Sequence, residues 1–83
     1  MNHHVLTIHQ LSEERTAEGI VYTAHISGTD AVKQQDFEGI VKKVDGFYRS
    51  ELFNSRNVNK VSGTCANLIK TKLDQEIKSC YFS

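Results

Sequence analysis

The sequence predicts one small α+β domain with the element order β-β-α-β-α, in which two helices pack on one face of a two- or three-stranded antiparallel sheet. Three patterns support this: alternating apolar residues near the N-terminus, helical spacing in the middle, and helical spacing near the C-terminus. A chain of 83 residues fits a single domain, residues 1–83, with a modest core. We find no internal repeat, low-complexity tract or linker that would divide it.

Two strands are predicted at the start of the chain. Residues 4–9 alternate apolar and polar side chains, and residues 19–27 do so more clearly, with the β-branched and aromatic residues that suit a pleated sheet. The second strand has four apolar residues on one face: Ile20, Tyr22, Ala24 and Ile26. Polar residues 11–19 are interpreted as a mobile loop. A hairpin that pairs Ile8 with Tyr22 brings the two apolar faces together.

The stretch 36–52 has a strong apolar pattern, and we expect it to form the helix against which the core packs. Its apolar residues follow the rhythm of one helical face: Phe37, Ile40, Val41, Val44, Phe47, Tyr48 and Leu52. Thr29 or Asp30 would cap this helix, because a side-chain oxygen there can accept a hydrogen bond from a free helix amide. The helix must accommodate Gly39 and Gly46, which each cost about 1 kcal/mol relative to alanine.

A hairpin is the alternative interpretation of the same stretch. Asp45-Gly46 lies between apolar runs, and both residues tolerate the positive φ that a type I′ turn requires. Residues 39–44 and 47–53 would then be two strands, but neither strand shows a clean alternation of apolar and polar residues. The sequence favours the helix, and a kink at the glycines would reconcile the two patterns.

The last third of the chain predicts a turn, a short strand and a second helix. Residues 54–57 form a turn cluster, and the mostly polar residues 58–62 suit an edge strand. Ser62 or Thr64 would cap the helix that follows. Its apolar positions have helical spacing: Cys65, Ala66, Leu68, Ile69, Leu73, Ile77, Cys80 and Tyr81.

Charge is unevenly distributed although the formal net charge is zero. Residues 1–53 hold five Lys or Arg and eight Asp or Glu, whereas residues 54–83 hold five and two. A basic C-terminal third can bind an anionic partner, and the contrast can also favour association of two copies. The candidate residues for binding a partner or a phosphate are Arg49, Arg56, Asn57, Asn59, Lys60, Thr64, Lys70 and Lys72. No zinc finger, helix-turn-helix or aromatic RNA-binding motif accompanies them.

Catalytic and metal motifs are absent from the sequence. Histidines at positions 3, 4, 9 and 25 include two that would share the outer hairpin face, but they show none of the usual metal-site spacings. Cys65 at a helix start would have a lowered pKa, yet its apolar neighbours favour a core role. Cys80 is about 22 Å away along one helix, so the pair cannot form a disulfide there and we expect reduced, buried thiols. The single glycine at Gly63 does not make a phosphate-binding Walker loop. We therefore expect no catalytic residue, no metal and no cofactor.

These observations favour a small, non-enzymatic regulatory or interaction protein that binds a macromolecular partner. We expect a homodimer in the cytoplasm, because the core is small and the sequence has neither a signal peptide pattern nor an apolar run of membrane-spanning length. The alternative is a nucleic-acid-binding module that uses the basic third. A small hydrolase or nuclease using His9 or His25 with Arg49 or Arg56 is the least supported function.

Overall fold

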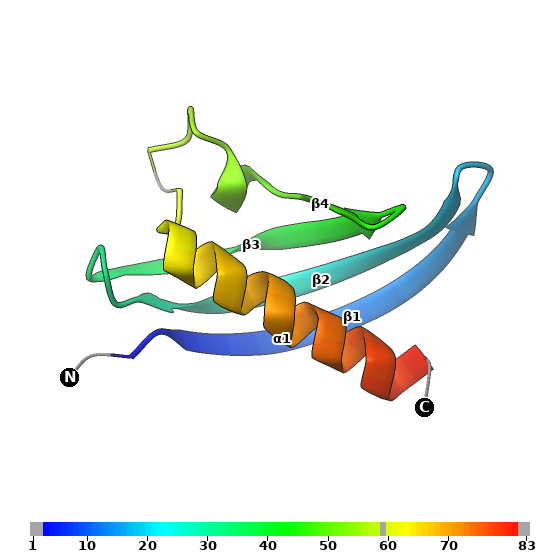
Figure 1. Ribbon diagram of the computed structural model, residues 1–83, viewed down its shortest axis with the longest axis horizontal. Helices are drawn as coiled ribbons and strands as arrows, with labels where there is room; N and C mark the ends of the chain where they lie inside the picture. Colours follow the sequence, from blue (N-terminus) through cyan, green and yellow to red (C-terminus); the bar gives the residue numbers. More distant parts are fainter. Residues whose placement is uncertain (1–2, 59, 82–83) are drawn as a thin grey trace.

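The computed structural model describes residues 3–58 and 60–81, which form a four-stranded antiparallel sheet with one α-helix lying across a single face (Figure 1). The strands lie side by side in chain order. The elements are β1 (Val5–Thr16), β2 (Gly19–Asp30), β3 (Gln35–Val44), β4 (Phe47–Arg49), the 3₁₀ helix η1 (Glu51–Phe53) and α1 (Gly63–Tyr81). The chain is thus a small α+β fold, but the predicted β-β-α-β-α order with two helices and two or three strands is wrong.

The predicted helix over 36–52 is the main error, because this stretch forms β3, a tight turn, β4 and η1. Phe37 and Val41 are buried on the face beneath α1, whereas Ile40 is 48% exposed and Phe47 is 70% exposed on the opposite face. Because apolar residues lie on both faces of these strands, their combined spacing along the sequence resembles that of one face of a helix. The hairpin alternative is the correct one, with shorter strand pairing in β4 than the predicted 47–53.

Asp45 and Gly46 form the turn between β3 and β4. Their φ angles are 52° and 82°, and Val44 pairs directly with Phe47, which is the geometry of a two-residue type I′ hairpin. Glycine is favoured at such positions because a Cβ atom strains a left-handed backbone.

We expect Gly46→Ala to lower the free energy of unfolding by about 1 kcal/mol. A Cβ at Gly46 would meet no atom within 4 Å, so the cost comes from the backbone conformation alone. Urea denaturation measures it, and Gly46→Asn should cost less because asparagine tolerates positive φ. A stabilising effect of the alanine would contradict the turn.

The predicted loop at residues 11–19 is wrong for most of its length, because β1 extends through it and pairs with β2 as far as Thr16 and Gly19. The predicted register is also wrong, because Ile8 pairs with Ile26 and not with Tyr22. A β-bulge lies between Ile8 and Gln10. The extra residue returns the apolar side chain at position 11 to the face beneath α1, where it packs against the core.

The predicted C-terminal helix is confirmed as α1. Its buried side chains recur every four residues, which gives one apolar stripe that faces the sheet: Cys65, Ile69, Leu73 and Ile77. The Oγ of Ser62 accepts a hydrogen bond from the Cys65 N–H (3.4 Å), so the predicted cap is present. Residues 60–62 lead into α1 without forming the predicted edge strand, and Asn59 lies outside the described residues.

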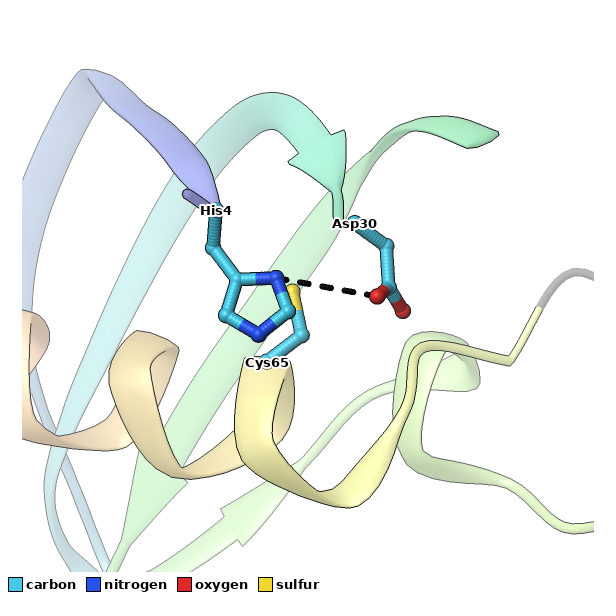
Figure 2. A group of neighbouring side chains, drawn as sticks. All are labelled: His4, Asp30 and Cys65. Atoms are coloured by element: carbon cyan, nitrogen blue, oxygen red, sulfur yellow. Dashed lines mark ion pairs between the residues drawn. The ribbon is translucent and has the colours of Figure 1, made fainter. Parts of the chain in front are cut away.

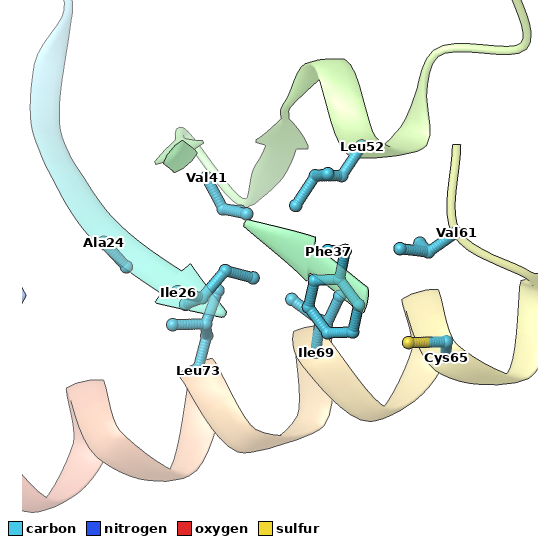
Figure 3. Packing of buried hydrophobic residues seen from close by; sticks show 9 residues of the cluster. All are labelled: Ala24, Ile26, Phe37, Val41, Leu52, Val61, Cys65, Ile69 and Leu73. Atoms are coloured by element: carbon cyan, nitrogen blue, oxygen red, sulfur yellow. The ribbon is translucent and has the colours of Figure 1, made fainter. Parts of the chain in front are cut away.

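The core lies between α1 and the inner face of β2 and β3 (Figure 3). Leu52 from η1 and Val61 from the following loop belong to the same cluster and close one edge of it. Asp74 joins the β3–β4 hairpin to α1, because it accepts hydrogen bonds from Lys43 Nζ (2.7 Å) and from the Tyr48 hydroxyl. Burial opposes its charged form, but these hydrogen bonds outweigh burial and lower the pKa of the Asp74 carboxyl.

Candidate functional site

Two places on the molecule combine polar groups in a way that deserves a functional test: a buried polar cluster at the end of β2 and an open pocket beside β3. The cluster centres on Asp30, which is only 1% exposed. Its carboxylate accepts hydrogen bonds from the Ser62 N–H (2.5 Å), the Ser62 hydroxyl (2.8 Å) and the N–H groups of Val32 (3.0 Å) and Lys33 (3.3 Å). Burial opposes the charged form, but these bonds prevail and lower the pKa of Asp30.

His4 and Cys65 complete this cluster (Figure 2). The Nδ1 of His4 accepts a hydrogen bond from the Ala31 N–H (2.9 Å) and lies 3.6 Å from Asp30 Oδ1. Because Nδ1 is an acceptor, the ring proton is on Nε2, which donates to Thr64 Oγ1 (2.9 Å). The cluster therefore ties the start of β1, the end of β2 and the start of α1 together.

The Cys65 thiol is not suited to nucleophilic chemistry, although it lies beside a histidine and a carboxylate. It is 0% exposed, and burial, assisted by the negative charge of Asp30, raises its pKa to about 11. The predicted core role is confirmed, but the expected lowering of its pKa is wrong. Cys80 is also a free thiol and is exposed, so only one of the two thiols is buried as expected.

His4, Asp30 and Cys65 offer ligand atoms that all lie within 4.8 Å of one another, which is compact enough for a metal ion. A metal ion would compete with existing hydrogen bonds, because His4 Nδ1 and both Asp30 oxygens already accept backbone or hydroxyl hydrogen bonds. A metal would also have to displace the proton of a thiol whose pKa is raised. We interpret the cluster as a structural connection between elements.

The pocket beside β3 has a volume of about 730 Å³. Side chains and main-chain atoms from β3, the β3–β4 hairpin, η1 and the next loop line it: Glu38, Gly39, Ile40, Lys42, Arg49, Ser50, Glu51, Leu52, Asn54 and Asn57. Ser50 shapes this place, because its hydroxyl donates to the Ile40 carbonyl (2.7 Å) and accepts from the Leu52 N–H (3.1 Å). The chain leaves the sheet there, and the pocket opens where β4 would otherwise continue.

The predicted binding residues do not form one surface. Arg49 and Asn57 line the pocket, and Arg56 borders a smaller hollow next to it. Thr64 bonds to His4, the Lys60 carbonyl accepts a hydrogen bond from Lys33, and Lys70 lies over the Phe53 ring at 5.2 Å. Lys72 lies on the β1 side of α1, near Leu6 and Ile8. Asn59 is outside the described residues.

Most of the residues that line the pocket are not among the predicted binding residues. Ile40 and Lys42 fall within the predicted helix, and the acidic residues Glu38 and Glu51 enter the sequence analysis only through the total charge. The Asp45-Gly46 turn was the signal that could have identified these residues, because a hairpin places Lys42 opposite Arg49.

Comparisons with protein-family models, with curated proteins and with solved structures gave no match. None of the helical segments in the described residues combines the length and the apolar character needed to cross a bilayer.

Proposed function

We propose that this protein is a non-enzymatic interaction module that binds an extended segment of a partner protein along the free edge of β3. The observation that carries this proposal is the unequal pairing of β3. β2 pairs with it from Gln35 to Val44, whereas β4 pairs only with Lys42, Lys43 and Val44. In the described chain, β4 does not pair with positions 36–41, so these positions have a sheet neighbour on one side only. A partner segment would add a strand there.

The backbone groups of the free edge point toward the pocket. Val44 closes the two-residue turn with Phe47, so every second residue back along β3 directs its N–H and C=O away from β2. The hydrogen bond from Ser50 to the Ile40 carbonyl agrees with this direction. Glu38 thus offers its N–H and C=O to an added strand, and Ile40 offers its N–H, because Ser50 already donates to the Ile40 carbonyl.

The side chains around the pocket suit a peptide better than a phosphate backbone. Ile40 gives an exposed apolar base, and Asn54 contributes an amide that can bond to a peptide main chain. The charges of Lys42 and Arg49 are balanced by those of Glu38 and Glu51. A nucleic acid needs an excess of positive charge, because neutralising phosphates dominates its affinity.

The opposite edge of the sheet is less suited to strand addition. β1 is bulged between Ile8 and Gln10, and three consecutive charged residues follow toward the hairpin: Glu13, Glu14 and Arg15. Bulges and charged side chains are common devices that prevent an edge from pairing with another strand. β3 has Gly39 and Ile40 at its edge instead.

Selection from a displayed library of random peptides would test this function. We expect the selected peptides to protect the amides of Glu38 and Ile40 from hydrogen exchange, because these groups would enter the new ladder. Ile40→Lys should weaken peptide binding at least tenfold, since a lysine on an edge opposes pairing. The matched control is Val32→Lys, which changes another exposed apolar residue in the β2–β3 turn.

Four results would contradict the proposal. Peptide binding could be unchanged in Ile40→Lys, or protection could appear on β1. If the protein forms a dimer and Ile40→Lys dissociates it, the edge of β3 binds a second copy of this chain. The edge would then be the interface of the expected homodimer and not a site for another protein. The protein could also bind a duplex or single-stranded oligonucleotide in a salt-sensitive way. If the double change Arg56→Glu and Lys60→Glu abolishes that binding, the result would favour the nucleic-acid alternative.

A further inference from the structure

The uncovered face of the sheet carries two histidines in contact with each other. His25 lies on β2 with a side chain that is 37% exposed, and His9 is an exposed residue of the bulge in β1. Their ring centroids are 5.1 Å apart with an angle of 37° between the planes. Gln10, not His9, is the residue that pairs with His25, so the bulge brings His9 beside His25.

One nitrogen of each ring is held by a neighbouring side chain. His25 Nε2 lies 3.3 Å from Glu38 Oε2, and His9 Nε2 lies 2.5 Å from Ser27 Oγ. The tautomer of His25 that donates Nε2–H to Glu38 leaves an electron pair on Nδ1. Metal-binding histidines commonly have this arrangement, in which one nitrogen binds the ion and the other donates to a carboxylate or hydroxyl.

We propose that His9 and His25 form a surface site for a divalent late transition metal such as Zn²⁺, with Glu38 as the positioning carboxylate. A zinc–nitrogen bond of 2.0–2.1 Å places each ring centroid about 3.2 Å from the ion, so tetrahedral coordination separates two centroids by about 5 Å. The observed separation of 5.1 Å already matches this value. Water would take the remaining positions, since the two histidines supply only half of a tetrahedral set. Imidazole nitrogen suits zinc, copper and nickel, whereas magnesium and calcium prefer oxygen.

This site is accessible to a metal ion from solvent, unlike the buried cluster at Asp30. Its rings are on the open face of the sheet, and in the described part of the chain no protein group holds Nδ1 of either ring. An ion can therefore bind without opening the core. The proposal does not depend on peptide binding at β3, although Glu38 borders both places.

Calorimetric titration of the full chain with zinc chloride at pH 7.5 tests the site. All proteins carry Cys80→Ser, so that the exposed thiol cannot bind the ion. We expect one zinc site, and we expect His9→Gln and His25→Gln each to lower its affinity at least tenfold. Glu38→Ala should lower it about tenfold, as is usual for the partner of a metal-binding histidine.

His3→Gln is the control, because His3 is exposed but lies near the start of β1, away from this pair. Its affinity for zinc should be unchanged. NMR signals of the two imidazoles should shift together on zinc addition. Absence of a zinc site in the parent protein would overturn the proposal, as would an equal loss in the His3 variant or full affinity in either His9→Gln or His25→Gln.

Discussion

Replacing Gly28 by alanine should lower the free energy of unfolding by about 3 kcal/mol or more, a large share of the stability of so small a domain. A Cβ atom there would overlap the Val5 carbonyl of β1 and come within 2.9 Å of the Phe37 ring from β3. The carbonyl belongs to the backbone, so it cannot turn aside as a side chain can. Gly28 lies between both strands, and its substitution should separate β1 from the sheet.

Gly63→Ala is the matched control for this effect. A Cβ at Gly63 would meet nothing within 4 Å at the start of α1, so its stability should change by no more than about 0.5 kcal/mol. Urea denaturation of both variants measures the difference. A cost below about 1 kcal/mol for Gly28→Ala would show that β1 does not approach β2 as closely as described.

Asp30→Ala should lower the free energy of unfolding by about 3 kcal/mol, because it leaves the donors of Ser62 without their charged acceptor in a buried position. Asp36→Ala is the control, since Asp36 is an exposed aspartate that accepts a bond from Thr29. Its loss should cost no more than about 0.5 kcal/mol. Equal costs in the two variants would contradict the role assigned to the Asp30 cluster.

The same carboxylate should make the protein sensitive to acid. The folded pKa of Asp30 lies below the reference value of 3.8, so the unfolded state takes up its proton first as the pH falls. The stability that Asp30 contributes is present above pH 3.8 and is lost as the pH falls through its folded pKa. Asp74 behaves in the same sense. We expect stability curves of the parent protein and Asp30→Asn to converge in this acidic range, as followed by circular dichroism.

The elements that the sequence predicted well are those with one apolar face. α1 has a single buried stripe, and β2 alternates cleanly from Tyr22 to Ile26. The prediction for β3 and β4 was wrong because Ile40 and Phe47 are apolar yet exposed. A pattern of residue types does not distinguish an exposed isoleucine from a buried one. The turn at Asp45-Gly46 carried the correct information, but the apolar spacing outweighed it.

The candidate sites were less predictable because they depend on register. A shared outer face for His9 and His25 follows from strand alternation, but their contact requires the bulge in β1. The pocket requires β4 to end at Arg49, which depends on two hydrogen bonds of Ser50. The sequence shows the donors and acceptors in these bonds but not which of them will meet.

The order of the strands has a consequence for how the chain folds. Because each strand pairs with the next one in sequence, every step of sheet assembly closes a loop of only a few residues. Short loops cost little chain entropy, so the sheet can form by successive local pairing from any of its three hairpins. Docking of α1 onto the sheet brings together residues that are distant in sequence, because it forms the contacts of Asp74 with Lys43 and of Ser62 with Asp30. We therefore expect docking of α1 onto the sheet to be the rate-limiting step of folding, and strand pairing to be largely complete before that step.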